Sequence, residues 1–280
     1  MIPLSILVLG VIGILAAILL FIASKKFKVY EDPRIGEIEK LLPGANCGGC
    51  GFSGCHAFAI ECVSAKSLDG LYCTSLNKEG MKTVAGILGL TAGDIVKKIA
   101  IVKCGADCNS RKVNNTYDGV TSCVVEASLY QGESNCIYGC LGNGDCVRAC
   151  PFGAMKIDSS KRLAHVDISL CTGCGKCVEA CPRNLCELIP AKTEFADVWV
   201  SCSNKDKGAV AMKECEISCI GCGKCLRVCP VKAPSINSFL AYIDQEKCIS
   251  CGKCVEECPR HCIFTSSKVF NVNNSPAQPS

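Results

Sequence analysis

Apolar positions are concentrated at the start of the chain. Residues 2–22 are apolar except for Pro3, Ser5 and two glycines, and no charged residue precedes Lys25. A helix of this length can cross the hydrocarbon core of a bilayer, which is about 30 Å thick. The pattern therefore predicts a transmembrane helix over residues 1–24.

The charges that follow this segment predict its orientation. Lys25, Lys26 and Lys28 come after the apolar run, whereas a cleaved signal peptide carries its basic residues in front of a shorter run. Lys and Arg that flank a membrane helix stay in the cytoplasm. We therefore expect a single-pass protein of the cytoplasmic membrane, with its N-terminus outside and residues 25–280 in the cytoplasm.

The rest of the chain has little hydrophobic periodicity. Short apolar patterns predict helices over residues 37–42 and 56–63 and strands over residues 99–104 and 198–202. The hydrophobic content of 49% includes 28 Cys, against a single Trp in 280 residues. Cys at this density indicates disulfides or bound metal. Because a reducing cytoplasm disfavours disulfides, we expect thiolates that bind metal.

The spacing of the cysteines indicates which metal they bind. Three runs follow the pattern C-x2-C-x2-C-x3-C-P, by which bacterial ferredoxins bind pairs of [4Fe–4S] clusters. Zinc sites instead favour two pairs of ligands separated by a longer loop. The three runs are Cys171, Cys174, Cys177 and Cys181; Cys219, Cys222, Cys225 and Cys229; and Cys248, Cys251, Cys254 and Cys258.

A fourth, looser run is interpreted through internal repetition. It has five residues between its second and third Cys, but segment 136–190 repeats as 219–264 with a period of about 78 residues. Two dicluster modules follow, in which three Cys of one run and the last Cys of the other hold each cluster. The predicted ligand sets are Cys136, Cys140, Cys146 and Cys181; Cys150, Cys171, Cys174 and Cys177; Cys219, Cys222, Cys225 and Cys258; and Cys229, Cys248, Cys251 and Cys254.

A different arrangement lies closer to the apolar N-terminus. Cys47, Cys50 and Cys55 stand in a glycine-rich loop between the two predicted helices, and Cys73 follows. The glycines allow the backbone to close tightly around a metal. We expect these four thiols to hold a fifth [4Fe–4S] cluster, with zinc as the alternative that spacing alone leaves open.

The combination of these motifs resembles a known family. An apolar anchor, the segment Leu42-Pro-Gly-Ala-Asn-Cys47-Gly-Gly-Cys50-Gly-Phe-Ser-Gly-Cys55 with Cys73, and ferredoxin modules up to about residue 264 are similar to the B subunits of Rnf complexes, in their expanded form. The resemblance implies an electron carrier between reduced soluble ferredoxin and a membrane complex that couples NAD⁺ reduction to Na⁺ or H⁺ transport. Its implied partners are the other subunits of that complex, ferredoxin and the lipid bilayer.

Eight cysteines fall outside these five sets: Cys62, Cys104, Cys108, Cys123, Cys186, Cys202, Cys215 and Cys262. Cys62, Cys186 and Cys262 are expected to be buried thiols in the core. Cys104, Cys123, Cys202 and Cys215 flank the first module on both sides and form a candidate sixth cluster site, the alternative being scattered thiols in an inserted α/β region. We therefore expect five [4Fe–4S] clusters, or six.

Charge and missing motifs narrow the function. The formal charge of +4 falls to roughly −6 or below once five clusters of about −2 each are counted, so no nucleic-acid partner is expected. Neither G-x-G-x-x-G nor G-x4-G-K-[ST] occurs, so no flavin or nucleotide site is expected, nor a catalytic site beyond the clusters. We expect five basic residues near the clusters to be solvated: Lys103, Arg111, Lys112, Arg183 and Arg260.

The predicted fold is α+β, with a transmembrane helix, a small four-Cys iron–sulfur domain and two tandem dicluster modules with an inserted α/β region. Two other functions stay open: a polyferredoxin component of a hydrogenase or formate-oxidising membrane complex, and a non-redox metal-binding scaffold. The expected segments are anchor 1–24, linker 25–35, membrane-proximal domain 36–98, intervening region 99–135, first module 136–190, connecting segment 191–214, second module 215–265 and tail 266–280.

Overall fold

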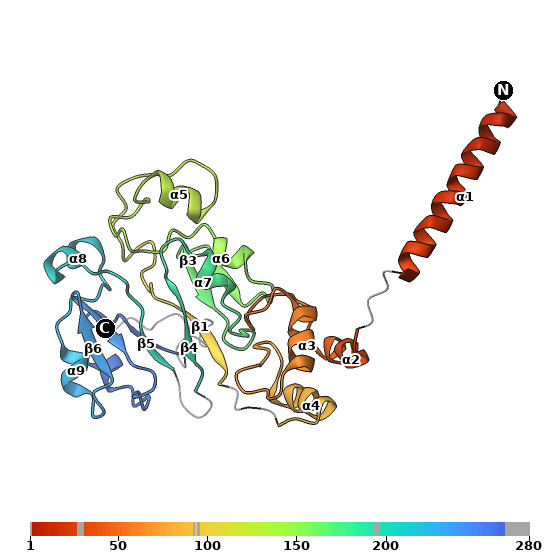
Figure 1. Cartoon of the computed structure of the whole chain (residues 1–280). Coiled ribbons are helices and arrows are strands. Elements are labelled where there is room, and N and C mark those ends of the chain that lie inside the picture. The colour runs from red at the N-terminus through yellow and green to blue at the C-terminus, as the bar shows by residue number, and fades with distance from the viewer. Residues whose placement is uncertain (1, 27–30, 92, 94–95, 193–196, 267–280) are drawn as a thin grey trace.

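The computed structural model describes residues 2–26, 31–91, 93, 96–192 and 197–266. The chain begins with helix α1 (Ile2–Lys26), which Figure 1 shows standing apart from the remaining elements. Within the described part of the chain, no helix has the length and apolarity that a membrane span requires. The predicted tail lies outside the described residues from position 267 onward.

Three helices form a small N-terminal domain. Helix α2 (Pro33–Leu41) begins after Asp32, whose carboxylate accepts the Arg34 N–H at 2.9 Å, and α3 (Cys55–Ser64) and α4 (Lys78–Leu88) follow. A side chain that satisfies the first N–H groups in this way stabilises a helix start. Ile38, Phe58 and Met81 are buried between these helices. The helices predicted over residues 37–42 and 56–63 are thus confirmed as α2 and α3.

The rest of the described chain contains four antiparallel strand pairs in two similar groups. The first group pairs β1 (Lys98–Val102) with β4 (Cys186–Pro190) and β2 (Met155–Asp158) with β3 (Leu163–Val166). The second pairs β5 (Val198–Val200) with β8 (Ile263–Thr265) and β6 (Pro234–Asn237) with β7 (Leu240–Ile243). The predicted strands at 99–104 and 198–202 are confirmed as β1 and β5. Each pairs with the last strand of the module that follows it, so the strand pairing crosses the boundaries predicted at 136 and 215.

Short helices carry the Cys runs of both modules. The first module has α5 (Cys123–Leu129), α6 (Asp145–Arg148) and α7 (Lys176–Ala180), and the second has α8 (Gly208–Glu214), α9 (Lys224–Val228) and α10 (Lys253–Glu256). Helices α6, α7, α9 and α10 each follow a glycine with positive φ. The predicted mixture of helix and strand is therefore confirmed.

Each module has its own hydrophobic core, and the two cores meet at β5, where Val198 and Val200 are buried in the cluster of the second module. Trp199 and Cys215, which belong to the second module, are buried in the same cluster as strand β1 and residues of the first module. Backbone and side-chain bonds join the loops after β1 and β5: the Gly105 N–H donates to the Ser201 carbonyl at 2.9 Å, and the Ser201 hydroxyl to the Val102 carbonyl at 3.1 Å. The loops that follow these two strands therefore contact each other between the modules.

Candidate metal centres

The second module has a cavity that matches the regular ferredoxin run. Four predicted ligands line it around an empty volume of about 360 Å³: Cys219, Cys222, Cys225 and Cys258. Gly221 lets this ligand loop pack against the start of β7, because its φ is +65° and a Cβ there would lie 2.8 Å from the Phe239 carbonyl oxygen. The Ala241 N–H donates to the Cys219 sulfur at 3.5 Å. The structure thus brings this predicted set together.

The other Cys set of the second module is also assembled. Burial, together with the nearby thiols of Cys248, Cys225, Cys251 and Cys229, raises the pKa of the Cys254 thiol to about 11; Cys225 belongs to the neighbouring set. The Ser250 N–H donates to the Cys248 sulfur at 3.4 Å. A thiol with such a pKa is protonated at neutral pH, so a metal has to displace its proton.

In the first module the equivalent cavity takes one thiol from outside the run. Alignment of Cys140, Cys146 and Cys150 with Cys219, Cys225 and Cys229 places Asn143 opposite Cys222. The cavity, with an empty volume of about 400 Å³, is instead lined by Cys123 from the start of α5, together with Cys140, Cys146 and Cys181. The structure therefore groups Cys123, and not Cys136, with these three thiols.

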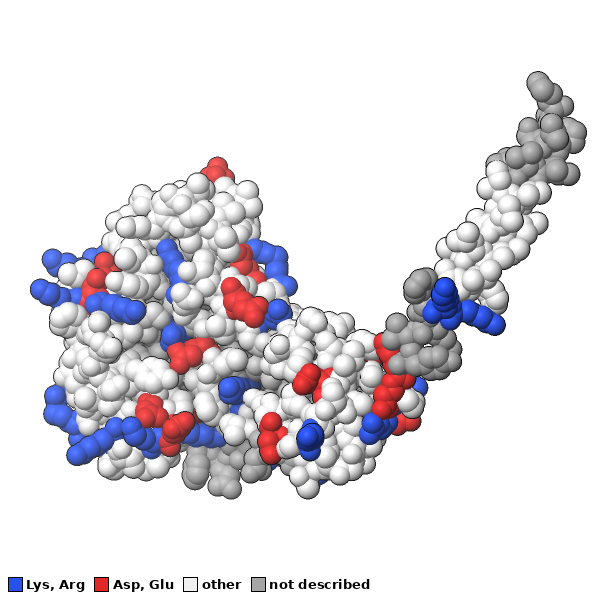
Figure 2. Space-filling model, in the orientation of Figure 1, with Lys and Arg blue, Asp and Glu red and all other residues white. Residues whose placement is uncertain are grey.

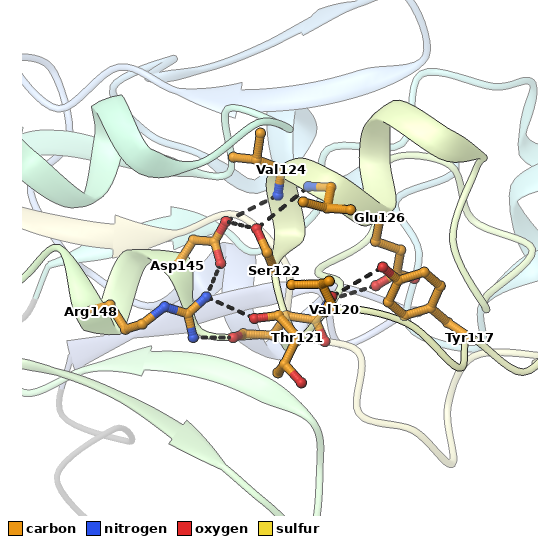
Figure 3. A network of polar contacts seen from close by, with 10 residues as sticks. Tyr117, Val120, Thr121, Ser122, Val124, Glu126, Asp145 and Arg148 are labelled. Atoms are coloured by element: carbon orange, nitrogen blue, oxygen red, sulfur yellow. Dashed lines mark hydrogen bonds and ion pairs between the residues drawn. The ribbon is translucent and has the colours of Figure 1, made fainter.

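A polar network joins the residues that flank Cys123 to Asp145 and Arg148 (Figure 3). The Asp145 carboxylate accepts the Ser122 hydroxyl and the Val124 N–H, both at 3.0 Å, on either side of Cys123. Arg148 donates to the Thr121 carbonyl at 3.0 Å and pairs with Asp145. Burial raises the pKa of Asp145, but these N–H and hydroxyl donors lower it, and the net shift is downward. The carboxylate that fixes α5 is therefore ionised at neutral pH.

A loop of the N-terminal domain contacts a loop of the first module near Cys174. Ala100 in β1 donates its N–H to the Cys171 sulfur at 3.3 Å. In the N-terminal domain, Asn46 accepts the Cys55 N–H at 2.8 Å, and a Cβ on Gly49 would lie 2.7 Å from the Cys174 Cα. Burial raises the pKa of the Cys73 thiol, with Cys50 and Cys47 as neighbouring thiols. The loop of Cys47 and Cys50 thus packs directly on the loop of Cys174.

A third cavity of similar size lies between the modules. It has an empty volume of about 370 Å³ and is lined by the thiols of Cys104, Cys136, Cys202 and Cys215. The sequence predicted Cys136 at the site of Cys140, Cys146 and Cys181, and Cys123 at the site of Cys104, Cys202 and Cys215. The structure places these two thiols the other way round. Cys136 precedes the ligand loop and lies between the modules, whereas α5 folds back onto that loop and brings Cys123 to it.

The remaining thiols have other surroundings. Cys62, Cys186 and Cys262 are buried, as predicted for core residues. Cys262 lies 3.6 Å from the Cys258 sulfur, at the wall of its cavity. The Cys108 thiol donates to the Ser160 carbonyl at 3.2 Å, as a protonated thiol does.

Thiols of this number and placement suit iron–sulfur clusters. In the described residues, no group of three or more Cys, His, Asp or Glu converges as the ligands of one metal ion would. A [4Fe–4S] cluster takes its four thiolates on four different irons. Cavities with Cys at their walls and N–H groups donating to sulfur suit such a group.

The structure corrects the expectation that the basic residues near the clusters are solvated. Figure 2 shows Lys and Arg interspersed with Asp and Glu on the visible face, so this face is not uniformly basic. Arg111, expected to be solvated, is only 7% exposed and donates to the carbonyls of Cys140 and Arg162. Arg183 is half-buried and donates to the Gly139 carbonyl at 2.6 Å. The spacing of the cysteines does not predict these contacts of Arg111 and Arg183 with backbone carbonyls.

Comparison with known families agrees with this arrangement. The family described as a 4Fe-4S dicluster domain matches residues 135–185 and 218–262, and a family described as an Fe-S cluster matches residues 42–68. These ranges coincide with the two modules and with the loop of Cys47, Cys50 and Cys55.

Full-length relatives extend the similarity over most of the chain. The B subunit of the Na⁺-translocating ferredoxin:NAD⁺ oxidoreductase complex of Acetobacterium woodii is 42% identical over 257 residues, which are 91% of this chain and 75% of the relative. Its counterpart in the proton-translocating complex of Clostridium ljungdahlii is 40% identical, over 85% of this chain and 82% of the relative. The B subunit of the ion-translocating oxidoreductase complex of Methanosarcina acetivorans is 39% identical, over 87% and 90%. The chain therefore belongs to the family of B subunits of ion-translocating ferredoxin:NAD⁺ oxidoreductase complexes, the Rnf family.

Proposed function

We propose that this chain is the electron-transfer component of a membrane-bound complex that couples electron flow from reduced ferredoxin towards NAD⁺ to the transport of Na⁺ or H⁺. The relatives from Acetobacterium woodii and Clostridium ljungdahlii carry names that state this activity. The observation that carries the proposal is the series of Cys-lined cavities that runs through both modules. The chain folds into a mixture of helices and strands around these cavities, as a dicluster electron carrier does.

Five sets of thiols are proposed as cluster ligands. A [4Fe–4S] cluster, when bound, accepts and releases one electron without a change in its ligands. The sets are Cys47, Cys50, Cys55 and Cys73; Cys150, Cys171, Cys174 and Cys177; Cys123, Cys140, Cys146 and Cys181; Cys219, Cys222, Cys225 and Cys258; and Cys229, Cys248, Cys251 and Cys254.

The protein around these thiols sets their position and polarity. Backbone N–H groups donate to the sulfurs of Cys171, Cys181, Cys219 and Cys248 at 3.3 to 3.5 Å. Such bonds stabilise the more negative, reduced state of a cluster and thereby raise its potential. Chain segments from the two modules and the N-terminal domain pack against one another, which keeps successive sites close.

The two ends of the series have different accessibility. Cys222 and Cys251 are the exposed cysteines of the chain, and both belong to the second module. We place the soluble donor, reduced ferredoxin, at this module. The N-terminal domain contacts the first module at the opposite side of the run, between Gly49 and Cys174, and we place the integral subunits of the complex next to it.

Helix α1 is proposed as the membrane anchor. Leu15, Leu19 and Phe21 are among its exposed apolar side chains, and Lys25 and Lys26 lie in its last turn. By the rule that basic flanks remain cytoplasmic, the N-terminus is outside and the cluster-bearing part is inside. The anchor then holds the N-terminal domain beside the membrane partners.

The function is tested by removing a ligand of the N-terminal domain in the intact complex. We expect Cys47→Ala to lose about four irons per chain, to keep the other sites, and to abolish NAD⁺ reduction by reduced ferredoxin. Cys62→Ala, which removes a buried thiol of the same domain, is the matched control and should keep both iron and activity. A Cys47→Ala complex that lost its four irons and still reduced NAD⁺ at the wild-type rate would rule out this route.

A further inference from the structure

The cavity of the regular run in the second module contains one thiol more than a cluster needs. Cys262 lines it together with the four proposed ligands. Cys262 is only 2% exposed, and its sulfur lies 3.6 Å from the Cys258 sulfur. A [4Fe–4S] cluster takes one thiolate on each of its four irons. Since the Cys spacing assigns these irons to the other four thiols, Cys262 has no iron to bind and keeps its proton.

The backbone around Cys262 fixes the thiol at the wall of this cavity. Cys262 directly precedes β8, and its carbonyl accepts the Ser201 N–H at 2.7 Å, next to the pairing of β5 with β8. The side chain is buried in the core of the second module. Hydrogen bonds with the sulfurs of Cys219 and Cys258 raise the pKa of the Cys262 thiol. The thiol is thus directed at two proposed ligands.

A thiol in this position can donate its proton to a ligand sulfur. The S–H group is a weak donor, but a hydrogen bond to a charged acceptor is stronger than one to a neutral acceptor. The ligand sulfurs are negative, and they become more so when the cluster takes up an electron. Donors to these sulfurs therefore stabilise the reduced state and raise the reduction potential. In this cavity Cys262 adds such a donor to the Ala241 N–H, which donates to the Cys219 sulfur.

The first module has a fifth thiol at its equivalent cavity. Cys186, the first residue of β4, lines this cavity beside Cys181 and is only 4% exposed. Hydrogen bonds with ligand sulfurs of the module raise the pKa of the Cys186 thiol. Alignment of Cys181 with Cys258 places Leu185 opposite Cys262, so Cys186 lies one residue further along the chain. Both modules thus have a thiol beside the Cys that precedes proline, supplied from adjacent positions.

From this geometry we propose that Cys262 and Cys186 are positioning residues that raise the reduction potential of the cluster at their sites. Cys262 donates its S–H to the Cys258 sulfur, and Cys186 donates its S–H to the Cys181 sulfur. The inference rests on the proposed function, because it requires [4Fe–4S] clusters in these cavities. It goes beyond that function by assigning a role to two thiols that belong to none of the five ligand sets.

The extra donor distinguishes the two sites of the second module. At the other site, the thiols with the largest effect on the pKa of Cys254 are all proposed ligands. The site with the extra donor is the one that faces the first module, since the Cys219 N–H donates to the sulfur of Cys202, in the loop after β5 that contacts the loop after β1. A higher potential there favours electron transfer from the Cys254 site towards the first module.

The experiment measures reduction potentials in the full-length chain prepared without oxygen, by redox titration followed with low-temperature EPR, and counts iron in the same samples. Cys262→Ala should keep the wild-type iron content, because no ligand is removed. The equilibrium constant for reduction of one cluster should fall about tenfold, which lowers its potential by about 59 mV. Cys262→Ser keeps a donor and should stay closer to the wild-type potential. Ile263→Val, which alters the same wall without removing a donor, is the matched control and should leave the potential unchanged.

The other outcomes would overturn the inference. Full iron content with wild-type potentials in Cys262→Ala would exclude the donor and leave the proposed function standing. Loss of about four irons in Cys262→Ala would show that Cys262 is itself a ligand. An equal shift in Ile263→Val would assign the effect to packing. A wild-type chain without iron would contradict the proposed function as well. If Cys262→Ala fails to fold, Cys186→Ala makes the same test in the first module, with the same shift expected.

Discussion

The two ferredoxin-like modules have the same strand pairing, but the thiols of their equivalent cavities come from different places. In the second module a regular run supplies Cys219, Cys222 and Cys225 from one loop. In the first module Asn143 occupies the position of Cys222, and Cys123 reaches the cavity from α5. The comparison shows that the fold preserves the position of a thiol in space, while the segment that supplies it can change.

The largest expected effect comes from moving this ligand. Cys123→Ser should remove about four irons from the chain, as Cys222→Ser does in the second module, because each substitution leaves three of the four proposed ligands at its cavity. The double variant Cys123→Ser with Asn143→Cys should regain them, since it restores the regular spacing. Iron analysis and low-temperature EPR of the reduced protein measure both effects. A Cys123→Ser chain with full iron content would show that Cys123 is not a ligand.

A smaller effect is expected from the residue that positions Cys123. Asp145→Ala removes the acceptor of the Ser122 hydroxyl and the Val124 N–H, so the start of α5 loses two of its bonds to the ligand loop. Loss of an outer residue that orients a ligand lowers metal affinity by about 10-fold to 100-fold. The rate of iron loss to a chelator, followed by absorbance, measures the change. Lys224→Ala, at the corresponding position of the second module, should leave the rate unchanged.

Two glycines in the ligand loops of the second module should differ in their tolerance of substitution. Gly221→Ala and Gly252→Ala both place a side chain at positive φ, a strain of about 1–3 kcal/mol. At Gly252 nothing lies within 4 Å of the added Cβ, whereas at Gly221 the Phe239 carbonyl oxygen lies 2.8 Å away. We therefore expect the larger loss of stability for Gly221→Ala, measured by anaerobic thermal unfolding. Equal melting temperatures for the two variants would contradict this account of the loop.

The smallest effect is expected where the modules meet at the surface. The Tyr242 hydroxyl in β7 donates to the Glu187 carboxylate in β4 at 3.1 Å. Tyr242→Phe removes one hydrogen bond between the modules and should lower the unfolding free energy by about 0.5–1.5 kcal/mol. Iron content should stay at the wild-type value. A loss of iron in Tyr242→Phe would mean that this contact controls the cavities as well as the surface.

The sequence was sufficient to predict what depends on local spacing. The regular runs, the helices α2 and α3 and the strands β1 and β5 all follow from patterns within a few residues. The partner of β1, and the contact between the loops of Gly49 and Cys174, depend on the chain returning from far away. A spacing rule describes ligands within one loop, so it cannot predict contacts between distant segments.

The exchange of Cys123 and Cys136 had a signal that spacing rules did not use. Alignment of the two repeats at Cys150 and Cys229 places Asn143 opposite Cys222 and Cys136 opposite Cys215. The pairing of Asn143 with Cys222 indicates that a ligand is missing from the looser run. The pairing of Cys136 with Cys215 indicates that both thiols occupy the same position outside the runs. The burial of Arg111 had no such signal, since a lone arginine in a polar segment is usually solvated.

The exposure of Cys222 and Cys251 has a consequence for handling the protein in air. Thiolates are oxidised in the order of their accessibility, and all other cysteines are half-buried or buried. Oxygen damage should therefore begin in the second module. A briefly aerated sample should lose iron from the second module while the more buried sites are still intact.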